Sequence, residues 1–138
     1  MDTNHQLSIR KLTLSSKLEN VCKVESFLQQ CSNCNAIDSQ LYNDILLVLT
    51  EAVTNGICHG NCLNPHKKVV IEFHSDQRSM SFSITDEGKG FNPKEIPDPT
   101  HPANVTEPNG RGVYLMRTLS DQVQFTDNGR CVNIRFSY

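Results

Sequence analysis

The sequence lacks a strong charge of either sign, a long apolar run and a leader-like N-terminus. Its formal net charge is only -2, so no overall basic field attracts nucleic acid and we expect no direct binding to it. The longest apolar run, residues 45–49, is far shorter than the roughly 20 residues of a membrane-spanning helix. The first five residues have neither the basic region nor the apolar stretch of a secretory signal. These absences predict a cytoplasmic protein with no membrane partner.

The size and composition are those of an ordinary globular domain. The chain has 138 residues, of which 37% are apolar and 20% are charged. A chain of this size buries roughly 68–70% of its unfolded surface, so its core needs no metal or disulfide. We therefore expect one domain over residues 1–138.

The six cysteines allow a metal or redox site as an alternative to plain thiols. Cys31 and Cys34 have CxxC spacing, and Cys58, His59 and Cys62 are further candidate ligands. No second CxxC pair accompanies the first, and the pair follows a predicted helix, where a redox motif would not be expected. Free, reduced thiols are therefore the prediction.

Apolar periodicity predicts an α+β fold. Two helices are expected first: one capped by Ser15 or Ser16 and reaching Cys31, and, after a polar loop at 31–36, one capped by Asp38 or Ser39. A strand at 7–14 precedes them, and a strand at 67–74 and a strand ending at Asp86 follow. The last element is a hairpin that turns at Asp127-Asn128-Gly129. The first helix should bury Leu18, Val21, Val24 and Leu28. The order predicts a two-layer α/β sandwich with helices on one face of a mixed, mostly antiparallel sheet.

A proline-rich stretch interrupts this pattern between Asn92 and Asn109. It holds five of the six prolines, which disfavour regular structure. A loop of this length inside a compact domain is typically a lid or a binding loop. After it, a helix is expected to open at Gly110-Arg111-Gly112 and to bury Val113, Met116 and Leu119.

Asp86 ends a strand of regular alternation. Met80, Phe82 and Ile84 share its face, and serines and a threonine occupy the other. A carboxylate in register with apolar residues is costly to bury without a donor. In Asp86-Glu-Gly88-Lys-Gly90, the glycines leave room for a ligand. The Asp86 carboxylate can accept a hydrogen bond from an exocyclic amine of that ligand, such as the amine of adenine. The alternative is a simple turn in which Asp86 is a turn former.

Glu51 and Asn55 lie one turn apart on one stripe of the second helix. A carboxamide oxygen suits Mg²⁺, and a carboxylate one turn earlier can orient or deprotonate a hydroxyl or a water. The alternative is a solvated polar pair. Gly110-x-Gly112 at a helix start offers an anion site to which Arg111 adds charge, although such a pair also occurs at helix entries that bind nothing.

Together, these motifs resemble the nucleotide site of the GHKL (Bergerat-fold) ATPase superfamily. Its elements come in the same order: Glu51-Ala-Val-Thr-Asn55, then Asp86-x-Gly88-x-Gly90, a lid at about 92–109, and Asn109-Gly110-Arg111-Gly112-Val113. The resemblance covers nearly the whole chain. Within the superfamily, the chain is most similar to the small bacterial anti-sigma factor serine kinases.

The resemblance implies a site that uses ATP and Mg²⁺. Glu51 would be the general base, Asn55 the magnesium ligand and Asp86 the adenine reader. Gly88, Gly90 and Val113 would contact the nucleotide, and Gly110, Arg111 and Gly112 would cradle its phosphates. His59, at the end of the same helix, is either structural or nucleotide-facing. The chain departs from the family pattern where Arg130 and Cys131 replace the hydroxyl residues that often follow the glycine opening the last strand.

The resemblance also implies partners. A serine kinase of this group would transfer the γ-phosphoryl of ATP to a serine of an anti-anti-sigma protein with a STAS fold, and would also hold a sigma factor. A homodimer is implied, with the opening strand as a candidate edge. The alternative is a non-catalytic module in which ATP controls the sequestration of a regulatory partner.

Overall fold

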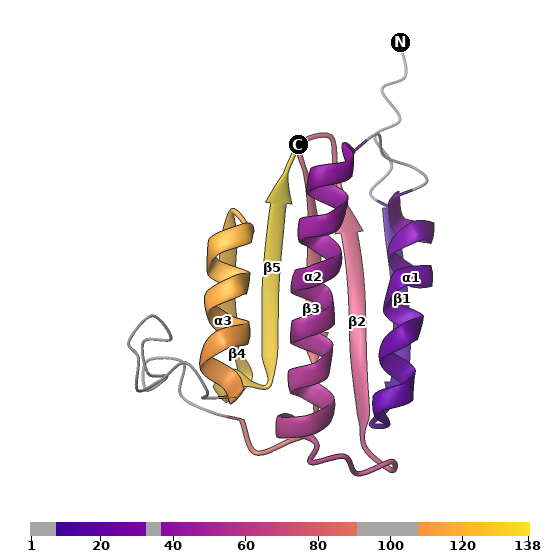
Figure 1. Cartoon of the computed structure of the whole chain (residues 1–138), viewed down its shortest axis with the longest axis vertical. Coiled ribbons are helices and arrows are strands. Elements are labelled where there is room, and N and C mark those ends of the chain that lie inside the picture. The colour runs from indigo at the N-terminus through magenta and orange to yellow at the C-terminus, as the bar shows by residue number, and fades with distance from the viewer. Residues whose placement is uncertain (1–7, 33–36, 91–107) are drawn as a thin grey trace.

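The computed structural model describes residues 8–32, 37–90 and 108–138. Five strands form one sheet in the order β1-β2-β3-β5-β4, with bounds β1 Ser8–Ser15, β2 Lys68–Ser75, β3 Ser79–Thr85, β4 Gln122–Thr126 and β5 Cys131–Ser137. All four described pairings are antiparallel. The helices α1 (Lys23–Ser32), α2 (Ser39–Asn55) and α3 (Pro108–Leu119) lie on one face of this sheet (Figure 1). The α+β sandwich is therefore confirmed.

The core lies between the helical layer and the inner face of the sheet. The alternation predicted for the strand before Asp86 is confirmed, because Met80, Phe82 and Ile84 are buried on the inner face. The α2 helix lies over the middle of the sheet and buries Ile45, Val48, Leu49, Ala52 and Val53 against it. Apolar burial thus fixes the orientation of α2, and with it the position of the polar residues at its C-terminal end.

The N-cap of α2 is the one expected. Asp38 is extended, and its side chain accepts a hydrogen bond of 2.7 Å from the Leu41 N–H. At the other end, α2 continues into a π-helical turn at Gly56–Gly60. Such turns place backbone and side chains differently from a regular helix, and they are frequent at functional sites.

The predicted serine cap of the first helix is wrong. A 3-10 turn at Leu18–Cys22 comes first, and α1 begins only at Lys23. The Ser16 hydroxyl donates to the Lys67 carbonyl at 2.8 Å, so it ties the end of β1 to the start of β2 instead of capping a helix. Because of this turn Leu18 is 53% exposed, whereas Val24 and Leu28 are buried as predicted.

Three boundaries also move. The predicted loop at 31–36 starts later, because α1 runs to Ser32, with Cys31 buried in the core. The strand predicted at 67–74 is shifted by one residue, to Lys68–Ser75. The helix expected at Gly110 begins at Pro108, since a proline has the φ of a helical first turn and no N–H to leave unpaired. The rest of the predicted lid, and Cys34, lie outside the described residues.

The hairpin predicted at Asp127-Asn128-Gly129 is confirmed. It joins β4 and β5, which pair in register from Gln122–Arg135 to Thr126–Cys131. Asp127, Asn128 and Gly129 all have positive φ, a conformation that Asn, Asp and Gly adopt most readily. This turn brings residues 127–130 to the end of β3, beside Asp86.

Candidate functional site

A cavity of about 320 Å³ opens at the end of the core where α2 and β3 finish. Its walls come from the end of α2 and its π-helical turn, the segment after β3, α3 and the β4–β5 hairpin. Five of the seven glycines of the chain line it: Gly56, Gly60, Gly88, Gly90 and Gly129. Because glycines have no side chain, they leave this end of the core open.

Asp86 points into this cavity, as the strand alternation predicts. Its N–H extends the sheet by donating to the Arg130 carbonyl at 3.0 Å, and its Oδ1 accepts from the Gly88 N–H at 2.8 Å. Burial raises the pKa of Asp86 above its ordinary value, because the half-buried carboxylate has lost part of its water, although the Gly88 hydrogen bond opposes this shift. Among the described residues no donor bonds its second oxygen, which can accept a donor from a ligand.

Glycine at position 60 makes room for this carboxylate. A Cβ on Gly60 would lie 2.5 Å from the carboxyl carbon of Asp86, and a Cβ on Gly88 would lie 2.0 Å from the Gly60 carbonyl oxygen. Both distances are well inside van der Waals contact. The π-helical turn and the loop after β3 therefore pack backbone against backbone around Asp86.

Asn61 holds these segments together. Its buried side chain donates to Ser16 Oγ at 2.8 Å and to the Lys68 carbonyl at 2.9 Å, and it accepts from the Glu87 N–H at 2.8 Å. One amide thus joins β1, β2 and the loop that carries Asp86. Asn61 has no predicted role, since two of its three partners, Ser16 and Glu87, are 45 and 26 residues away in sequence.

Glu51 and Asn55 meet α3 at Gly112. A Cβ on Gly112 would lie 2.6 Å from Asn55 Nδ2 and 3.5 Å from Glu51 Oε2. Asn55 lines the cavity, and Glu51 is half-buried one turn before it. The two polar residues and the second glycine motif, predicted to share a site, do lie together because Gly112 lets α3 approach α2 closely.

The other predicted residues divide into two groups. Gly88, Gly90 and Val113 line the cavity, and Gly90 has a φ of 78°, which a non-glycine residue rarely adopts. Gly110 and Arg111 belong to the first turn of α3, and the exposed side chain of Arg111 is not among those lining the cavity. The predicted residues that line this one cavity are therefore Asn55, Asp86, Gly88, Gly90 and Val113, whereas Glu51, Gly110, Arg111 and Gly112 are not among its lining residues.

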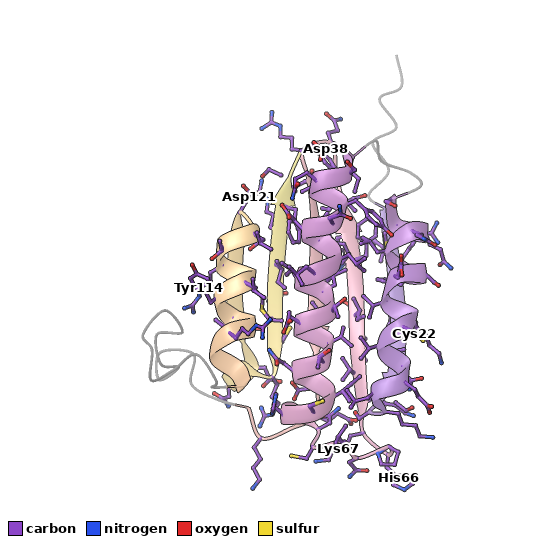
Figure 2. All side chains as sticks on the ribbon, in the orientation of Figure 1. Cys22, Asp38, His66, Lys67, Tyr114 and Asp121 are labelled. Atoms are coloured by element: carbon purple, nitrogen blue, oxygen red, sulfur yellow. The ribbon has the colours of Figure 1, made fainter. Side chains whose placement is uncertain are left out.

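Four basic side chains that the motifs did not predict as a group also line the cavity: His59, Lys67, Lys89 and Arg130. Figure 2 places Lys67 where α2 ends and β2 begins. Of the described residues that line the cavity, Asp86 alone is acidic. His59 is exposed and lines the cavity, and its role, structural or nucleotide-facing, stays a prediction. This balance of charge suits an anionic ligand that also carries a hydrogen-bond donor.

The cysteines of the described residues form no metal-binding cluster, and Cys34 lies outside that part of the chain. Within residues 8–32, 37–90 and 108–138, no three His, Cys, Asp or Glu side chains are clustered as a metal would require. Cys62 lines the cavity and Cys31 is in the core, so these two do not share a site. None of the described helices is both long and apolar enough to cross a bilayer.

Comparison with known families identifies the domain. Residues 14–136 match the model of the histidine kinase-like ATPase domain, which is nearly the whole chain. The chain belongs to this family. The predicted GHKL resemblance is therefore confirmed, and so is the fold that it implies.

Curated relatives of this ATPase domain are anti-sigma factors and a protein kinase. The chain is 34% identical over 85 residues to the anti-sigma F factor of Oceanobacillus iheyensis, an alignment that covers 59% of this chain and 57% of that protein. It is 24% identical over 134 residues to the serine-protein kinase RsbW of Halalkalibacterium halodurans, covering 93% of this chain and 82% of that one. The first of these matches spans less than two thirds of the relative.

A solved structure shows the same fold. The chain superposes on a crystal structure of the RsbU and RsbW domains of a Mycobacterium tuberculosis protein with a TM-score of 0.61. The match covers 95% of this chain and 32% of that one, at 14% identity. At this identity, the likeness extends to the fold alone.

The cavity of this ATPase domain has the chemistry that ATP requires. Its walls are apolar at Ile84, Val113 and Met116, which suits a flat ring, and Asp86 offers an acceptor among them. The basic side chains suit phosphates. Asn55 carries a neutral carboxamide oxygen, a type of ligand that suits Mg²⁺.

Proposed function

We propose that this protein is an ATP-dependent serine kinase of the anti-sigma type, acting on a regulatory protein with a STAS fold. One observation carries this proposal: Glu51 and Asn55 meet Gly112 at one side of a cavity that also receives Asp86. The side chains that would recognise the adenine, bind Mg²⁺ and accept the serine proton thus lie in one cavity or at its edge. The sequence spacing alone places only Glu51 and Asn55 side by side on α2. It does not require that Gly112 and Asp86 lie near them.

Asp86 would select the base of the nucleotide. Its ionised carboxylate accepts hydrogen bonds, and adenine presents an amino group where guanine presents a carbonyl oxygen. Gly60 and Gly88 keep the approach to the carboxylate clear of side chains. The purine would then lie against the apolar wall formed in part by Ile84 and Met116.

Asn55 would hold Mg²⁺, and the start of α3 would hold the phosphates. The metal supplies neutralisation of phosphate charge during phosphoryl transfer. The carboxamide of Asn55 lines the cavity and lies against Gly112, two residues beyond Gly110 in the first turns of α3. The free N–H groups of a helix N-terminus favour anions, and Arg111 adds positive charge there.

Glu51 would accept the proton of the attacking serine. It is half-buried, precedes Asn55 by one helical turn, and is outside the set of residues lining the cavity. A general base at the edge of the cavity could reach a serine hydroxyl that a second protein presents. Such a base typically contributes a factor of about 10²–10⁴ to the rate.

The relatives support the choice of partner. One is named a serine-protein kinase and others are named anti-sigma F factors. We therefore propose a STAS-fold anti-anti-sigma protein as the phosphorylated partner and a sigma factor as the sequestered one. We also propose a homodimer, with the outer edge of β1 as one candidate contact, since β1 is an edge strand.

Transfer of labelled phosphate tests the kinase. The parent protein, Glu51→Gln and the control Glu25→Gln, which alters an exposed glutamate of α1, are incubated with ATP, Mg²⁺ and candidate STAS proteins. We expect phosphoserine with the parent and the control, and a rate at least about 10²-fold lower with Glu51→Gln, while ATP binding is retained. Full transfer by Glu51→Gln would exclude Glu51 as the base. ATP binding and partner capture without transfer by the parent would favour the non-catalytic switch.

A further inference from the structure

Arg130 makes contacts in the site that the family motifs do not account for. Its Nε donates to the Gly88 carbonyl at 2.8 Å. Its Nη1 contacts the Asp127 carboxylate at 3.0 Å, and the same atom donates to the Asp127 carbonyl at 3.3 Å. One side chain therefore connects the loop after β3 with the turn of the β4–β5 hairpin.

Backbone contacts join the same two segments. The Asp86 N–H donates to the Arg130 carbonyl, and a Cβ on Gly90 would lie 2.0 Å from the Asn128 carbonyl oxygen. The loop from Asp86 to Gly90 thus contacts the turn from Asp127 to Arg130 at Asp86, Gly88 and Gly90. Within this contact, the guanidinium is the part that both fixes Gly88 and carries charge.

Arg130 also stands among the charges that surround the Asp86 carboxylate. Burial raises the pKa of Asp86, Arg130 and Lys67 lower it, and Asp127 raises it. Among the described residues, the remaining ionisable groups that line the cavity are His59 on the π-helical turn, Cys62 just after that turn and Lys89 on the loop itself. Removing the guanidinium would leave a half-buried carboxylate with one fewer opposing charge.

We propose that Arg130 is a positioning residue for the nucleotide: it holds the Gly88 loop, and with it the Asp86 carboxylate, in the arrangement that accepts the amino group of a purine. This inference rests on the proposed ATP site. Arg130 need not touch the base, because it acts through Gly88 and through its charge beside Asp86. It stands where family members often carry a hydroxyl residue, so this chain uses a different means to shape the same end of the cavity.

The proposal predicts two separable effects of substitution. Arg130→Gln keeps a hydrogen-bond donor but removes the charge, so Asp86 should bind a proton at a higher pH than in the parent. The loss of ATP affinity on acidification should then begin at a higher pH. Arg130→Lys keeps the positive charge but lacks the planar guanidinium, whose several N–H groups reach both Gly88 and Asp127. Its pH profile should match the parent, while its affinity falls at every pH.

Calorimetric titration with ATP·Mg²⁺ and with GTP·Mg²⁺ over a pH series tests this. The proteins are the parent, Arg130→Gln, Arg130→Lys and the control Arg135→Gln, which alters an exposed arginine of β5, the strand that follows Arg130. At neutral pH we expect ATP affinity to fall about five- to tenfold in both Arg130 variants, the worth of about one hydrogen bond. The preference for ATP over GTP should fall with it, and the control should match the parent.

Each outcome decides one of two questions. If the parent binds ATP and both Arg130 variants bind it equally well, with the parent's pH profile, Arg130 has no positioning role. If affinity falls in both variants but the Arg130→Gln profile does not move, its charge does not act on Asp86 and the proposal is overturned in that part. If Arg130→Gln does not fold, the Arg130→Lys affinity decides the positioning role. If the parent binds no ATP, the proposed function fails, and this inference fails with it.

Discussion

The two ends of the inner sheet face differ in what occupies them. At one end Phe73, Phe82 and Phe136 fill the space beneath the helices, with ring centroids 5.3 Å apart for Phe73 and Phe82, and 6.2 Å apart for Phe82 and Phe136. At the other end glycines leave a cavity, and Asp86 faces into it. Phe82 and Asp86 lie on the same face of one chain segment, four residues apart.

This difference separates stability from binding within a single sheet. The three rings at the aromatic end are almost completely buried, so any loss of volume there costs stability. The cavity end gives up packing and partly buries a charge, both of which cost stability in the absence of a ligand. A protein tolerates such a region where it binds something, as functional sites commonly show.

The largest expected effect lies at the aromatic end. Phe82→Ala removes a fully buried ring that contacts two others, and it should lower the free energy of unfolding by about 3–5 kcal/mol. Denaturant unfolding measures this loss. The control Tyr114→Ala alters an aromatic residue that is 44% exposed and should change stability by less than about 0.5 kcal/mol. A loss below 1 kcal/mol for Phe82→Ala would mean that this end is not the packed one.

At the cavity end, Gly112→Ala should reduce binding more than stability. The added methyl would displace Asn55 Nδ2, 2.6 Å away, whereas alanine favours a helix by about 1 kcal/mol over glycine. We expect ATP·Mg²⁺ affinity to fall at least about tenfold, with unfolding free energy changed by no more than about 1 kcal/mol. Calorimetry and denaturant unfolding measure the two quantities. Arg117→Ala, on the exposed face of the same helix, is the control, and unchanged binding by Gly112→Ala would remove Asn55 from the site.

The smallest expected effect is the stability gained by removing the charge at the cavity end. The pKa of Asp86 is raised in the folded protein, so the folded state binds more protons than the unfolded one just above the ordinary value of 3.8. Unfolding free energy should therefore fall as pH rises through that window. Asp86→Asn keeps an oxygen that can accept from Gly88 and should lack this dependence. At neutral pH without nucleotide, it should be more stable by about 0.5–1 kcal/mol, since the half-exposed carboxylate is still partly solvated.

Thermal or denaturant unfolding of the parent and Asp86→Asn over a pH series measures that difference. Asp76 has a lowered pKa and acts in the opposite direction, but it is present in both proteins and cancels in the comparison. A parent that is more stable than Asp86→Asn at neutral pH without ligand would contradict the view that this carboxylate is a stability cost.

The sequence predicts those parts of the fold that depend on local periodicity. Three predicted features each depend on a few neighbouring residues, and all three are observed: the alternation ending at Asp86, the Asp38 cap and the Asn128-Gly129 turn. The cap at Ser15 or Ser16 was wrong because a distant carbonyl, that of Lys67, takes the Ser16 hydroxyl. A local sequence pattern does not show a hydrogen-bond partner that lies 51 residues away.

The site shows the same limit. The motifs identified Asp86, Asn55 and Gly112, whose residue types and spacing carry a chemical meaning. They did not identify Asn61 or Arg130, because the roles of these residues come from partners on other strands and turns. Only the fold places Arg130 beside Gly88, 42 residues earlier in the chain.

One titration tests the central claim, that the cavity receives an adenine whose amino group meets Asp86. ATP·Mg²⁺ and GTP·Mg²⁺ are titrated calorimetrically into the parent and into Asp86→Asn at neutral pH. We expect one ATP per chain, weaker binding of GTP, and at least an approximately tenfold loss of ATP affinity in Asp86→Asn, which presents an amide donor where adenine also presents a donor. Equal affinity of the two proteins for ATP, or no binding by the parent, would contradict it.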